Sequence, residues 1–415
     1  MKTYAKHVGL AALLLFALLL FFMPGVQAQE PAGTACVPDA ETLEAYRADG
    51  TLAERQAYYE SLSLNQTDPG LIAQAQAQES GSASLRAVPS GWKTGMATTG
   101  DANILLIRVD FPDYRFSGDD TEDALRQIAF GPAGGGQPGY PYESLSAYYE
   151  RSSYGQLHIS GQVASYTAAN NRDTYSRNMA GLFKEAMTAL DAQGMDFSQF
   201  DGNGDGLMDG VYIHFAGPDT GWGSPWWSQK AHYEGAPFVL DGVALSDYVT
   251  LHDNSANGAR TLIHETGHML GLADYYSYTA QAYENGIRTF DMMCDNTGDH
   301  NCFSKWLLGW INPEDITRVS AADGSAALTL SAISGNDGSK IAVVSPTDSG
   351  MFSEYFLIQY DVPGLNNEGI YYPDVPDSGF RVFHINAALN ADGSNFMYMN
   401  KTPAEPKLIE AVGPE

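Results

Sequence analysis

The chain has 415 residues, of which 44% are apolar, so it is long enough for about two or three compact units and too apolar for a disordered protein. Acidic residues outnumber basic ones by 50 to 22, which gives a formal net charge of -28. A surface this negative repels phosphate backbones and anionic lipids, which argues against nucleic acid and membrane-surface partners. The composition predicts a soluble exported protein, and the charge also suits calcium.

The first residues have the order of an export signal. Lys2 and Lys6 precede an apolar run at 8–22, and small residues follow at 26–28. This order is typical of a cleaved signal peptide, which we assign to residues 1–28. A membrane anchor is the alternative, but about 15 apolar residues are few for a bilayer core of about 30 Å. We therefore expect a secreted protein with no membrane insertion after signal cleavage.

Residues 29–88 are interpreted as a prosegment and linker. The pattern predicts one amphipathic helix at 41–62, and the polar, low-complexity stretch at 65–84 is typical of a linker or cleavable segment. Cys36 lies in this region. Its thiolate could occupy the open position of a zinc ion and keep a precursor inactive, and a bystander cysteine is the alternative.

Helices and strands then alternate. Apolar runs predict strands, and amphipathic periods predict helices, in the order strand 103–111, helix 121–130, helix 142–155, strand 157–166, helix 178–192 and strand 211–216. Beyond about residue 313, short strand-like runs are separated by turn residues, at 326–333, 340–346, 354–362 and 379–386. This indicates an α+β fold with a β-rich C-terminal region at 319–415, which we expect to continue beyond the last residue.

The segment TLIHETGHMLGLADYY at 261–276 carries the main chemical signal. On a helix, His264 and His268 project from one face about one turn apart, so both imidazoles can bind one zinc ion at about 2.0–2.1 Å. Glu265 stands beside them, in position to deprotonate a zinc-activated water as general base. Chance matches with structural histidines are the alternative, but H-E-x-x-H is a strong hydrolase signal because each residue has a mechanical role.

A catalytic zinc needs a third protein ligand. Gly271 can end the helix with a positive φ and turn the chain back, which brings Asp274 towards the ion. The pattern is H-E-x-x-H-x-x-G-x-x-D, with Asp where metzincins usually have a third His. Asp274 is therefore the expected third ligand, and Glu284 is the rival.

Several other residues are candidates for roles at this site. Met292 or, preferably, Met293 could form a packing platform beneath the metal, although a methionine is more often a core residue. His300 and Tyr276 could polarise a scissile carbonyl, and structural roles are the alternative. The tryptophans Trp222, Trp226 and Trp227 could line a cleft or pack in the core. Cys294 and Cys302 could form a disulfide in an oxidising compartment.

The chain resembles the M6 family of metallopeptidases, the immune inhibitor A group. The resemblance rests on PSGWKTGMATTG (89–100), ILLIRVDFPDY (104–114), SLSAYYERSSYGQLHISGQV (144–163), FDGNGDGLMDGVYIHFAG (200–217), the zinc helix, and FDMMCDNTGDHNCFSKWLLGWINP (290–313). It implies a secreted zymogen whose endopeptidase domain cleaves proteins. The implied fold is a metzincin- or zincin-like catalytic domain at 89–318, with a mixed sheet and an active-site helix.

An acidic loop follows the opening of a calcium-binding loop. Oxygen atoms at alternate positions could hold the ion, with a sharp turn at Gly206; the candidate ligands are Asp201, Asn203, Asp205, Leu207 through its carbonyl, and Asp209. Position twelve is Tyr212 and not a bidentate Glu, so the loop is not a standard EF-hand. A turn without an ion is the alternative, and any calcium is expected to be structural.

The sequence thus predicts a zinc-dependent endopeptidase that acts on protein or peptide substrates and is a monomer. A secreted, metal-stabilised binding protein without catalysis is the alternative. The carboxylate of Glu265 argues against it, because a structural zinc site has no use for a base beside an open ligand position.

Overall fold

The computed structural model describes residues 38–81, 95–134, 142–252, 259–278, 287, 290–320, 322, 325–336, 338–346, 350–367, 378–399 and 406–412. The expected signal peptide, Cys36, the start of the expected catalytic domain at 89–94, and Glu284 lie outside these residues. Helices and mixed sheets are both present, which confirms the α+β expectation.

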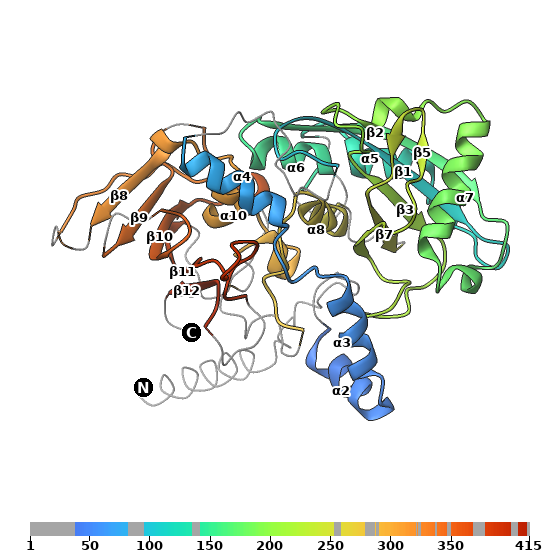
Figure 1. Ribbon diagram of the computed structural model, residues 1–415, viewed down its shortest axis with the longest axis horizontal. Helices are drawn as coiled ribbons and strands as arrows, with labels where there is room; N and C mark the ends of the chain where they lie inside the picture. Colours follow the sequence, from blue (N-terminus) through green and yellow to red (C-terminus); the bar gives the residue numbers. More distant parts are fainter. Residues whose placement is uncertain are drawn as a thin grey trace, which may run out of the picture. The chain divides into compact units, whose positions relative to one another are not determined.

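Five strands form the first sheet, in the order β2-β1-β3-β7-β4 (Figure 1). They are β1 (Gly100–Asp110), β2 (Leu157–Thr167), β3 (Val211–Phe215), β4 (Gln229–His232) and β7 (Asp247–His252). The first four in the sheet order run parallel, and β4 pairs antiparallel with β7 at the edge. A short hairpin of β5 (Val239–Leu240) and β6 (Val243–Ala244) lies apart from this sheet.

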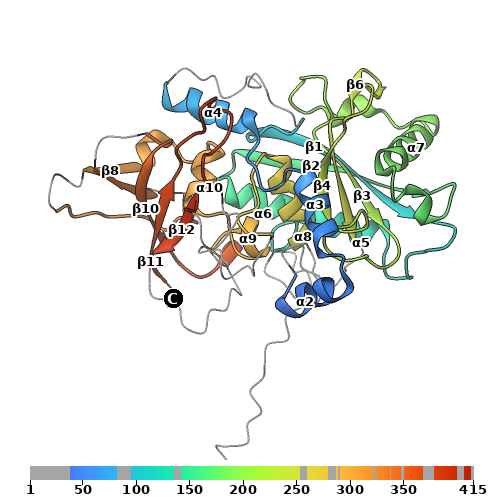
Figure 2. The same ribbon diagram turned by 60° about the horizontal axis from the view of Figure 1, so that its bottom comes forward.

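Both faces of the first sheet are covered, which explains the continuous apolar run of β1. Its residues Leu105, Ile107 and Val109 face a core completed by α7 (Met179–Ala192). Its residues Ile104 and Leu106 face the other core, which contains residues of α5 (Glu122–Phe130), α6 (Leu145–Ser152) and α8 (Arg260–Met269). Figure 2 shows α7 and α8 separated by the strands. The sheet therefore positions α8, the helix of the H-E-x-x-H motif.

Local sequence signals account for these helix starts. Thr121, Ser144 and Asn178 each accept a hydrogen bond from a backbone N–H of the first turn, as N-cap residues do. The six strands and helices expected between residues 103 and 216 all occur, with bounds shifted by a few residues. These predictions are confirmed.

A second sheet has the order β12-β11-β10-β9-β8. Its strands are β8 (Ile316–Ser320), β9 (Ile341–Ser345), β10 (Glu354–Asp361), β11 (Gly379–Asn386) and β12 (Ile409–Val412). β8 and β9 are parallel, and the other neighbours are antiparallel. The strand expected at 326–333 is wrong: it contributes a single bridge, Ala332 to Tyr360, because β10 already pairs with β9 and β11.

The N-terminal region contains three helices: α2 (Ala40–Asp49), α3 (Leu52–Ser61) and α4 (Pro69–Glu79). The single helix expected at 41–62 is wrong, because Gly50 adopts a left-handed conformation with φ 81° and ends α2. The linker expected at 65–84 is also wrong over most of its described length. Asp68 caps α4 through a hydrogen bond from Gly70, and Pro69 opens the helix.

Cys294 and Cys302 are not joined in a disulfide. Both are buried, in α9 (Met292–Asp295) and α10 (Cys302–Leu307) respectively, and the sulfur of Cys294 faces the carbonyl oxygen of Tyr275 at 3.8 Å. Proximity in sequence suggested the bridge, but two separate helices hold the cysteines within the core.

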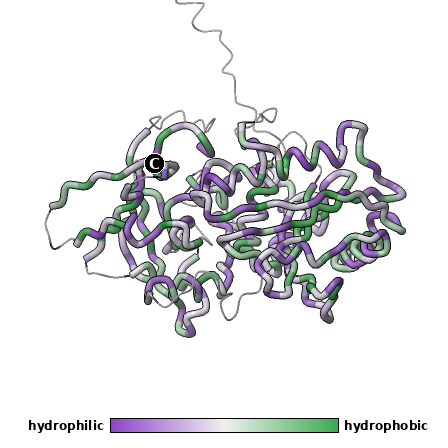
Figure 3. The backbone as a smooth tube through the Cα atoms, turned by 90° about the horizontal axis from the view of Figure 1, so that it is seen from above, coloured by the Kyte–Doolittle hydropathy of each residue, from purple (hydrophilic) through white to green (hydrophobic). Residues whose placement is uncertain are grey.

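Among the described residues, no helix is both long and apolar enough to span a membrane. In Figure 3, the hydrophobic stretches of the described chain are short and alternate with hydrophilic ones. This pattern is the one expected for strands and helices that each bury one side.

Candidate metal centre

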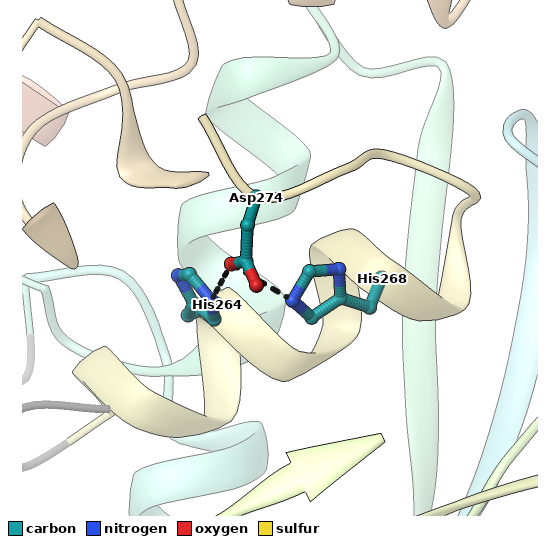
Figure 4. A group of neighbouring side chains, drawn as sticks. All are labelled: His264, His268 and Asp274. Atoms are coloured by element: carbon teal, nitrogen blue, oxygen red, sulfur yellow. Dashed lines mark hydrogen bonds and ion pairs between the residues drawn. The ribbon is translucent and has the colours of Figure 1, made fainter. Parts of the chain in front are cut away.

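Helix α8 carries two of the three expected metal ligands on one side. His264 and His268 have ring centroids 4.9 Å apart. The helix ends at Met269, and Gly271, two residues later, has φ 95°, the positive φ that the sequence predicted. The following residues turn back along the helix, and this turn brings Asp274 to the two imidazoles (Figure 4).

The three side chains converge on one point. Oδ1 of Asp274 lies 3.1 Å from Nε2 of His264 and 3.2 Å from Nε2 of His268. Ligand atoms around a tetrahedral zinc with bonds of about 2.0–2.1 Å are roughly 3.3 Å apart, so this spacing fits the ion. The three residues form the one group of potential ligands that meets among the His, Cys, Asp and Glu residues described.

Hydrogen bonds to carbonyl groups fix the state of both imidazoles. Nδ1 of His264 lies 3.0 Å from the carbonyl oxygen of Met292, and Nδ1 of His268 lies 2.9 Å from that of Leu272. A carbonyl oxygen only accepts, so each Nδ1 must carry the hydrogen. In the neutral ring the lone pair is then on Nε2, the atom that faces Asp274. This is the arrangement of a metal-binding histidine with its supporting carbonyl.

A cation is needed where these atoms meet. Two nitrogen lone pairs and a carboxylate oxygen repel one another unless a proton or a metal ion lies between them. Burial opposes protonation of His264, but the carboxylate of Asp274 outweighs it and raises the pKa of the imidazole. Burial likewise opposes ionisation of Asp274, yet the two imidazoles hold its pKa down, at about 2. The donor set therefore fits a divalent metal such as zinc.

Glu265 is fully buried beside this group, and neither of its carboxylate oxygens makes a hydrogen bond of normal geometry within the described chain. Burial raises the pKa of Glu265, although His264 and His268 act against this. A buried carboxylate without partners costs free energy, so such a group usually has a function. A base that accepts a proton from water is one function that this environment favours.

The one-turn helix α9 packs against the candidate metal ligands and holds them through its carbonyl groups. Its residue Met292 provides the carbonyl oxygen that holds His264, and the carbonyl oxygen of Met293 accepts from the N–H of Tyr275, next to Asp274. The sulfur of Met293 packs so closely against Gly267 of α8 that a Cβ there would lie 2.3 Å away. Met293 thus lies where the platform residue was expected.

Asp291 anchors this turn, and it was not among the residues selected from the sequence. Its buried carboxylate accepts hydrogen bonds from the N–H of Met293, the N–H of Asn301 and the hydroxyl of Ser304, each 2.8 Å long. An Asp directly before a short helical turn is a capping pattern, and that signal could have identified it.

The N-terminal region covers the metal ligands. The N–H of Asp274 donates to the carbonyl oxygen of Leu64, and the N–H of Asp68 donates to that of Gly271. The ring of Tyr59 from α3 packs against Trp222 and Tyr278, with ring centroids 5.0 and 4.9 Å away. As a result, His264, Glu265, His268 and Asp274 are all at most 3% exposed.

A cavity of about 1360 Å³ adjoins the metal ligands on the side of His268. The α3–α4 connection, residues 61–69, lines one part of it. The edge strand β4 with the loop that follows it, and one side of α7 along its whole length, line other parts. The N-terminal region therefore forms a wall of the space that leads to the candidate site.

Other sequence candidates lie away from the point where the ligands meet. Trp226 is buried against Phe111 and Phe215, and Trp222 lies under Tyr59, so neither lines the cavity. The two ring nitrogens of His300 face Asp291 and Tyr149, each at 3.4 Å, which leaves it no role at a scissile carbonyl in this arrangement.

Two tyrosines lie close to the ligands. The ring of Tyr276 stacks on His264 with centroids 6.3 Å apart, and its hydroxyl lies 3.4 Å from that of Tyr59. The hydroxyl of Tyr278 donates to Oδ2 of Asp274 at 2.8 Å. Tyr278 was not identified from the sequence, because no spacing rule relates it to the motif. This hydrogen bond orients the carboxylate so that Oδ1 faces the imidazoles.

The acidic loop at 201–209 is organised mainly by its own backbone. Asp201 accepts from the N–H groups of Gly204, Asp205 and Gly206. Asp209 is buried and accepts from the N–H of Asn103 and of Gly202, and burial raises its pKa to about 7. These hydrogen bonds are those of a tight turn. Calcium binding by Asp201, Asn203, Asp205, Leu207 and Asp209 stays a prediction.

No protein-family model matches the chain. A comparison with curated proteins gives one relevant likeness. The chain is similar to Immune inhibitor A. That protein is from Bacillus thuringiensis subsp. alesti, and the two are 26% identical over 230 residues. The matched region covers 45% of this chain and 33% of Immune inhibitor A, so this chain spans about a third of that relative's length. This distant likeness agrees with the resemblance drawn from the sequence motifs.

Proposed function

We propose that this protein is a secreted, zinc-dependent endopeptidase of a metzincin-like type, made as a latent precursor. The observation that carries the proposal is the meeting of His264, His268 and Asp274 beside the unpartnered carboxylate of Glu265. The likeness to Immune inhibitor A supports a protease of the metal-dependent class.

In this proposal, His264, His268 and Asp274 hold the zinc ion. When bound, zinc acts as a Lewis acid that activates water and polarises the substrate carbonyl. Glu265 accepts the proton of the attacking water and passes it to the leaving amine. Its raised pKa suits this exchange, because the carboxylate must both take and release a proton near neutral pH.

Protein substrates fit the architecture around the site. Strand β4 is the edge strand of the first sheet, and its residue Lys230 lines the cavity that includes His268. An extended peptide can add to such an edge through main-chain hydrogen bonds. This supports an endopeptidase that acts on the interior of a polypeptide.

Latency is part of the proposal. The cover formed by Tyr59 and by residues 62–66 leaves the four functional side chains almost without exposure. A peptide carbonyl cannot reach Glu265 while this cover is in place. Removal or displacement of the cover would therefore be the activating event.

The complete burial of the ligands also favours a second candidate, a non-catalytic protein stabilised by a structural metal. Structural zinc sites are closed, with four protein ligands. Here, the group contains three ligands, and Glu265 stands beside them as a base. These two features favour catalysis.

The test combines metal analysis with proteolysis. The purified, processed protein is expected to contain about one zinc per chain and to cleave casein. Glu265→Ala should keep the zinc and lose activity by a factor of about 100 or more, because general bases contribute about 100- to 10,000-fold. Casein cleavage by Glu265→Ala at the wild-type rate would refute the role of Glu265, and a wild-type protein without metal would refute the proposal.

A further inference from the structure

The N-terminal region divides at Asp68 into two parts that contact different segments of the protein. Arg55 and Gln56 of α3 donate to the carbonyl oxygens of Trp222 and Tyr278, on the side of the candidate site. Helices α2 and α3 each have one buried residue, Leu43 and Tyr59 respectively, whereas the buried residues of the shorter α4 are Gly70, Leu71, Ile72 and Ala75. Both parts contribute to the same core, but a larger share of α4 is buried.

Polar contacts join α4 and its flanking residues to distant segments of the chain. Glu79 forms an ion pair with Arg318 of β8 at 3.4 Å and accepts from the N–H of Met351 at 2.8 Å. Gln74 donates to the hydroxyl of Thr98, just before β1. The carbonyl of Thr67 accepts from the side chain of Asn395 at 3.0 Å. Helix α4 therefore connects the first sheet with the second.

Glycines elsewhere in the chain make room for this helix. A Cβ at Gly309 would lie 2.4 Å from the side-chain nitrogen of Gln78, and one at Gly350 would lie 2.1 Å from a carboxylate oxygen of Glu79. A Cβ at Gly271 would lie 3.0 Å from that of Asp68. At Gly309 and Gly350 the atoms met are the ends of flexible side chains, whereas at Gly271 it is the Cβ of the cap residue. Gly221 and Gly223 approach Tyr46 and Arg55 of α2 and α3 in the same way, so both parts of the N-terminal region fit closely against the chain.

We propose that residues 67–81 are a permanent structural part of the active protein and that only the preceding part, residues 40–66, is displaced on activation. This inference rests on the latent peptidase proposed above. The contacts that cover the metal ligands come from Tyr59, Leu64 and the chain between them, all on the N-terminal side of Asp68. Activation therefore requires the release of α3 and the α3–α4 connection, while α4 stays bound to the sheets.

The position of a proteolytic cut should decide whether the covering part is released. A cut in the α3–α4 connection frees the covering part directly. A cut after Gly81 leaves that part attached to α4, which remains in the core. The two cuts should therefore have different results, although they lie only about 15 residues apart, at 66 and 81.

The experiment uses the full chain with Glu265→Ala, so that self-cleavage cannot interfere. The recognition sequence of a site-specific protease is inserted either next to the exposed Gln66 or after Gly81, and the cut protein is analysed by native gel filtration and intact mass. After the cut at 81, the fragment should co-elute with the remainder and separate only in denaturant. After the cut at 66, the preceding fragment should separate, and the remainder should keep its melting temperature.

One outcome overturns the inference: the fragment cut at 81 separates, and the remainder keeps its melting temperature. Separation with unfolding of the remainder supports it, because the remainder then depends on α4. Ile72→Asp in the protein cut at 81 should release the fragment or lower the melting temperature, whereas Glu44→Ala at an exposed position of α2 should do neither. If Ile72→Asp does not fold, Glu79→Gln gives a milder test, with a lower melting temperature of the cut complex expected.

These readouts do not depend on catalysis. If the fragment stays bound but processed wild-type protein cleaves no casein, the proposed peptidase function fails and the structural role of α4 stands. If casein is cleaved and the fragment leaves a stable remainder, the function stands and this inference fails.

Discussion

The backbone N–H of Asp274 donates to the carbonyl oxygen of Leu64 across a distance of 2.7 Å. The proposed third metal ligand is therefore attached directly to the segment that covers the site. A second hydrogen bond, from Asp68 to Gly271, joins the start of α4, which stays in place in our proposal, to the same ligand-bearing turn. Release of the cover breaks contacts next to the metal ligand itself, so access to the site and the geometry of Asp274 are coupled.

Replacing Tyr59 by alanine should weaken latency. The ring packs between Trp222 and Tyr278, and loss of a buried aromatic ring costs about 3–5 kcal/mol. The cover should then open more often, so the unprocessed precursor should cleave a fluorogenic peptide that the wild-type precursor leaves intact. Tyr46→Ala is the matched control, because this half-buried residue of α2 contacts Arg55 and not the metal ligands. If neither precursor variant cleaves the peptide, the proposed cover is contradicted.

Asp274→Asn should reduce zinc affinity strongly. The amide keeps the shape of the side chain but removes the negative charge that faces both imidazoles. Mutation of a residue that only hydrogen-bonds to a metal ligand lowers metal affinity by about 10- to 100-fold. Loss of the charge of a ligand itself should therefore lower zinc affinity by roughly 100-fold or more. Competition with a chelator measures the affinity, with Asp219→Asn as control. Wild-type affinity in Asp274→Asn would remove Asp274 from the ligand set and make Glu284 the next residue to replace.

Asp291→Asn should lower zinc affinity without touching a ligand. Its carboxylate fixes the turn whose Met292 carbonyl orients His264, and an amide group would place a donor against one of the present donors. We expect a loss of about 10- to 100-fold in zinc affinity. Ser304→Ala removes only one of the hydrogen bonds to the Asp291 carboxylate and should have a smaller effect. An unchanged affinity in Asp291→Asn would mean that the turn holds its geometry without this anchor.

Gly271→Ala should destabilise the fold more than the same change at Gly242. Both glycines have a strongly positive φ, 95° and 89°, which costs alanine about 1–3 kcal/mol. At Gly242 the added Cβ meets nothing within 4 Å, whereas at Gly271 it lies 3.1 Å from the Cβ of Leu71 in α4. Denaturant unfolding measures both free energies. Equal losses would show that α4 adjusts to the added methyl group without cost.

Acid should destabilise the protein partly through His214. Burial lowers the pKa of this residue from 6.5 to about 4, with Asp120 acting against the shift and His252 and Arg108 with it. The folded state therefore holds a neutral ring, while the unfolded chain takes up a proton below about pH 6.5. Above about pH 6.5 this histidine does not reduce the free energy of unfolding. As the pH falls from about 6.5 to about 4, the free energy of unfolding drops by at most about 3 kcal/mol.

The measurement for this prediction is urea unfolding at several pH values from about 7 to about 4. His214→Phe should flatten the loss of stability in that range, since Phe suits the contact with Phe116 and does not titrate. The exposed His158→Gln should keep the wild-type slope. An unchanged slope in His214→Phe would assign the acid sensitivity to other groups.

Sequence patterns were sufficient where a segment's structure depends on its own residues. The apolar runs and amphipathic periods between 103 and 216 predicted the three α-helices and three strands found there, because the burial period is a local property. The same holds for the metal group: the four-residue spacing on a helix and the left-handed Gly271 bring His264, His268 and Asp274 together.

Patterns failed where the partner is distant in the chain. The polar composition at 65–84 indicated a linker, but α4 is stable because Arg318, Met351 and three glycines of other segments surround it. The spacing of Cys294 and Cys302 suggested a disulfide, yet each belongs to a separate buried helix.

The sequence by itself thus determined the types of the proposed ligands, the spacing of the two histidines on α8 and three of the five strands of the first sheet, since these follow from residue identity and short-range periodicity. Only the tertiary structure decided that the N–H of Asp274 donates to the carbonyl oxygen of Leu64, that Asp291 anchors the turn that holds His264, and that α4 joins the two sheets. Each of these contacts joins segments whose approach depends on the packing of the whole chain, and no local pattern encodes it.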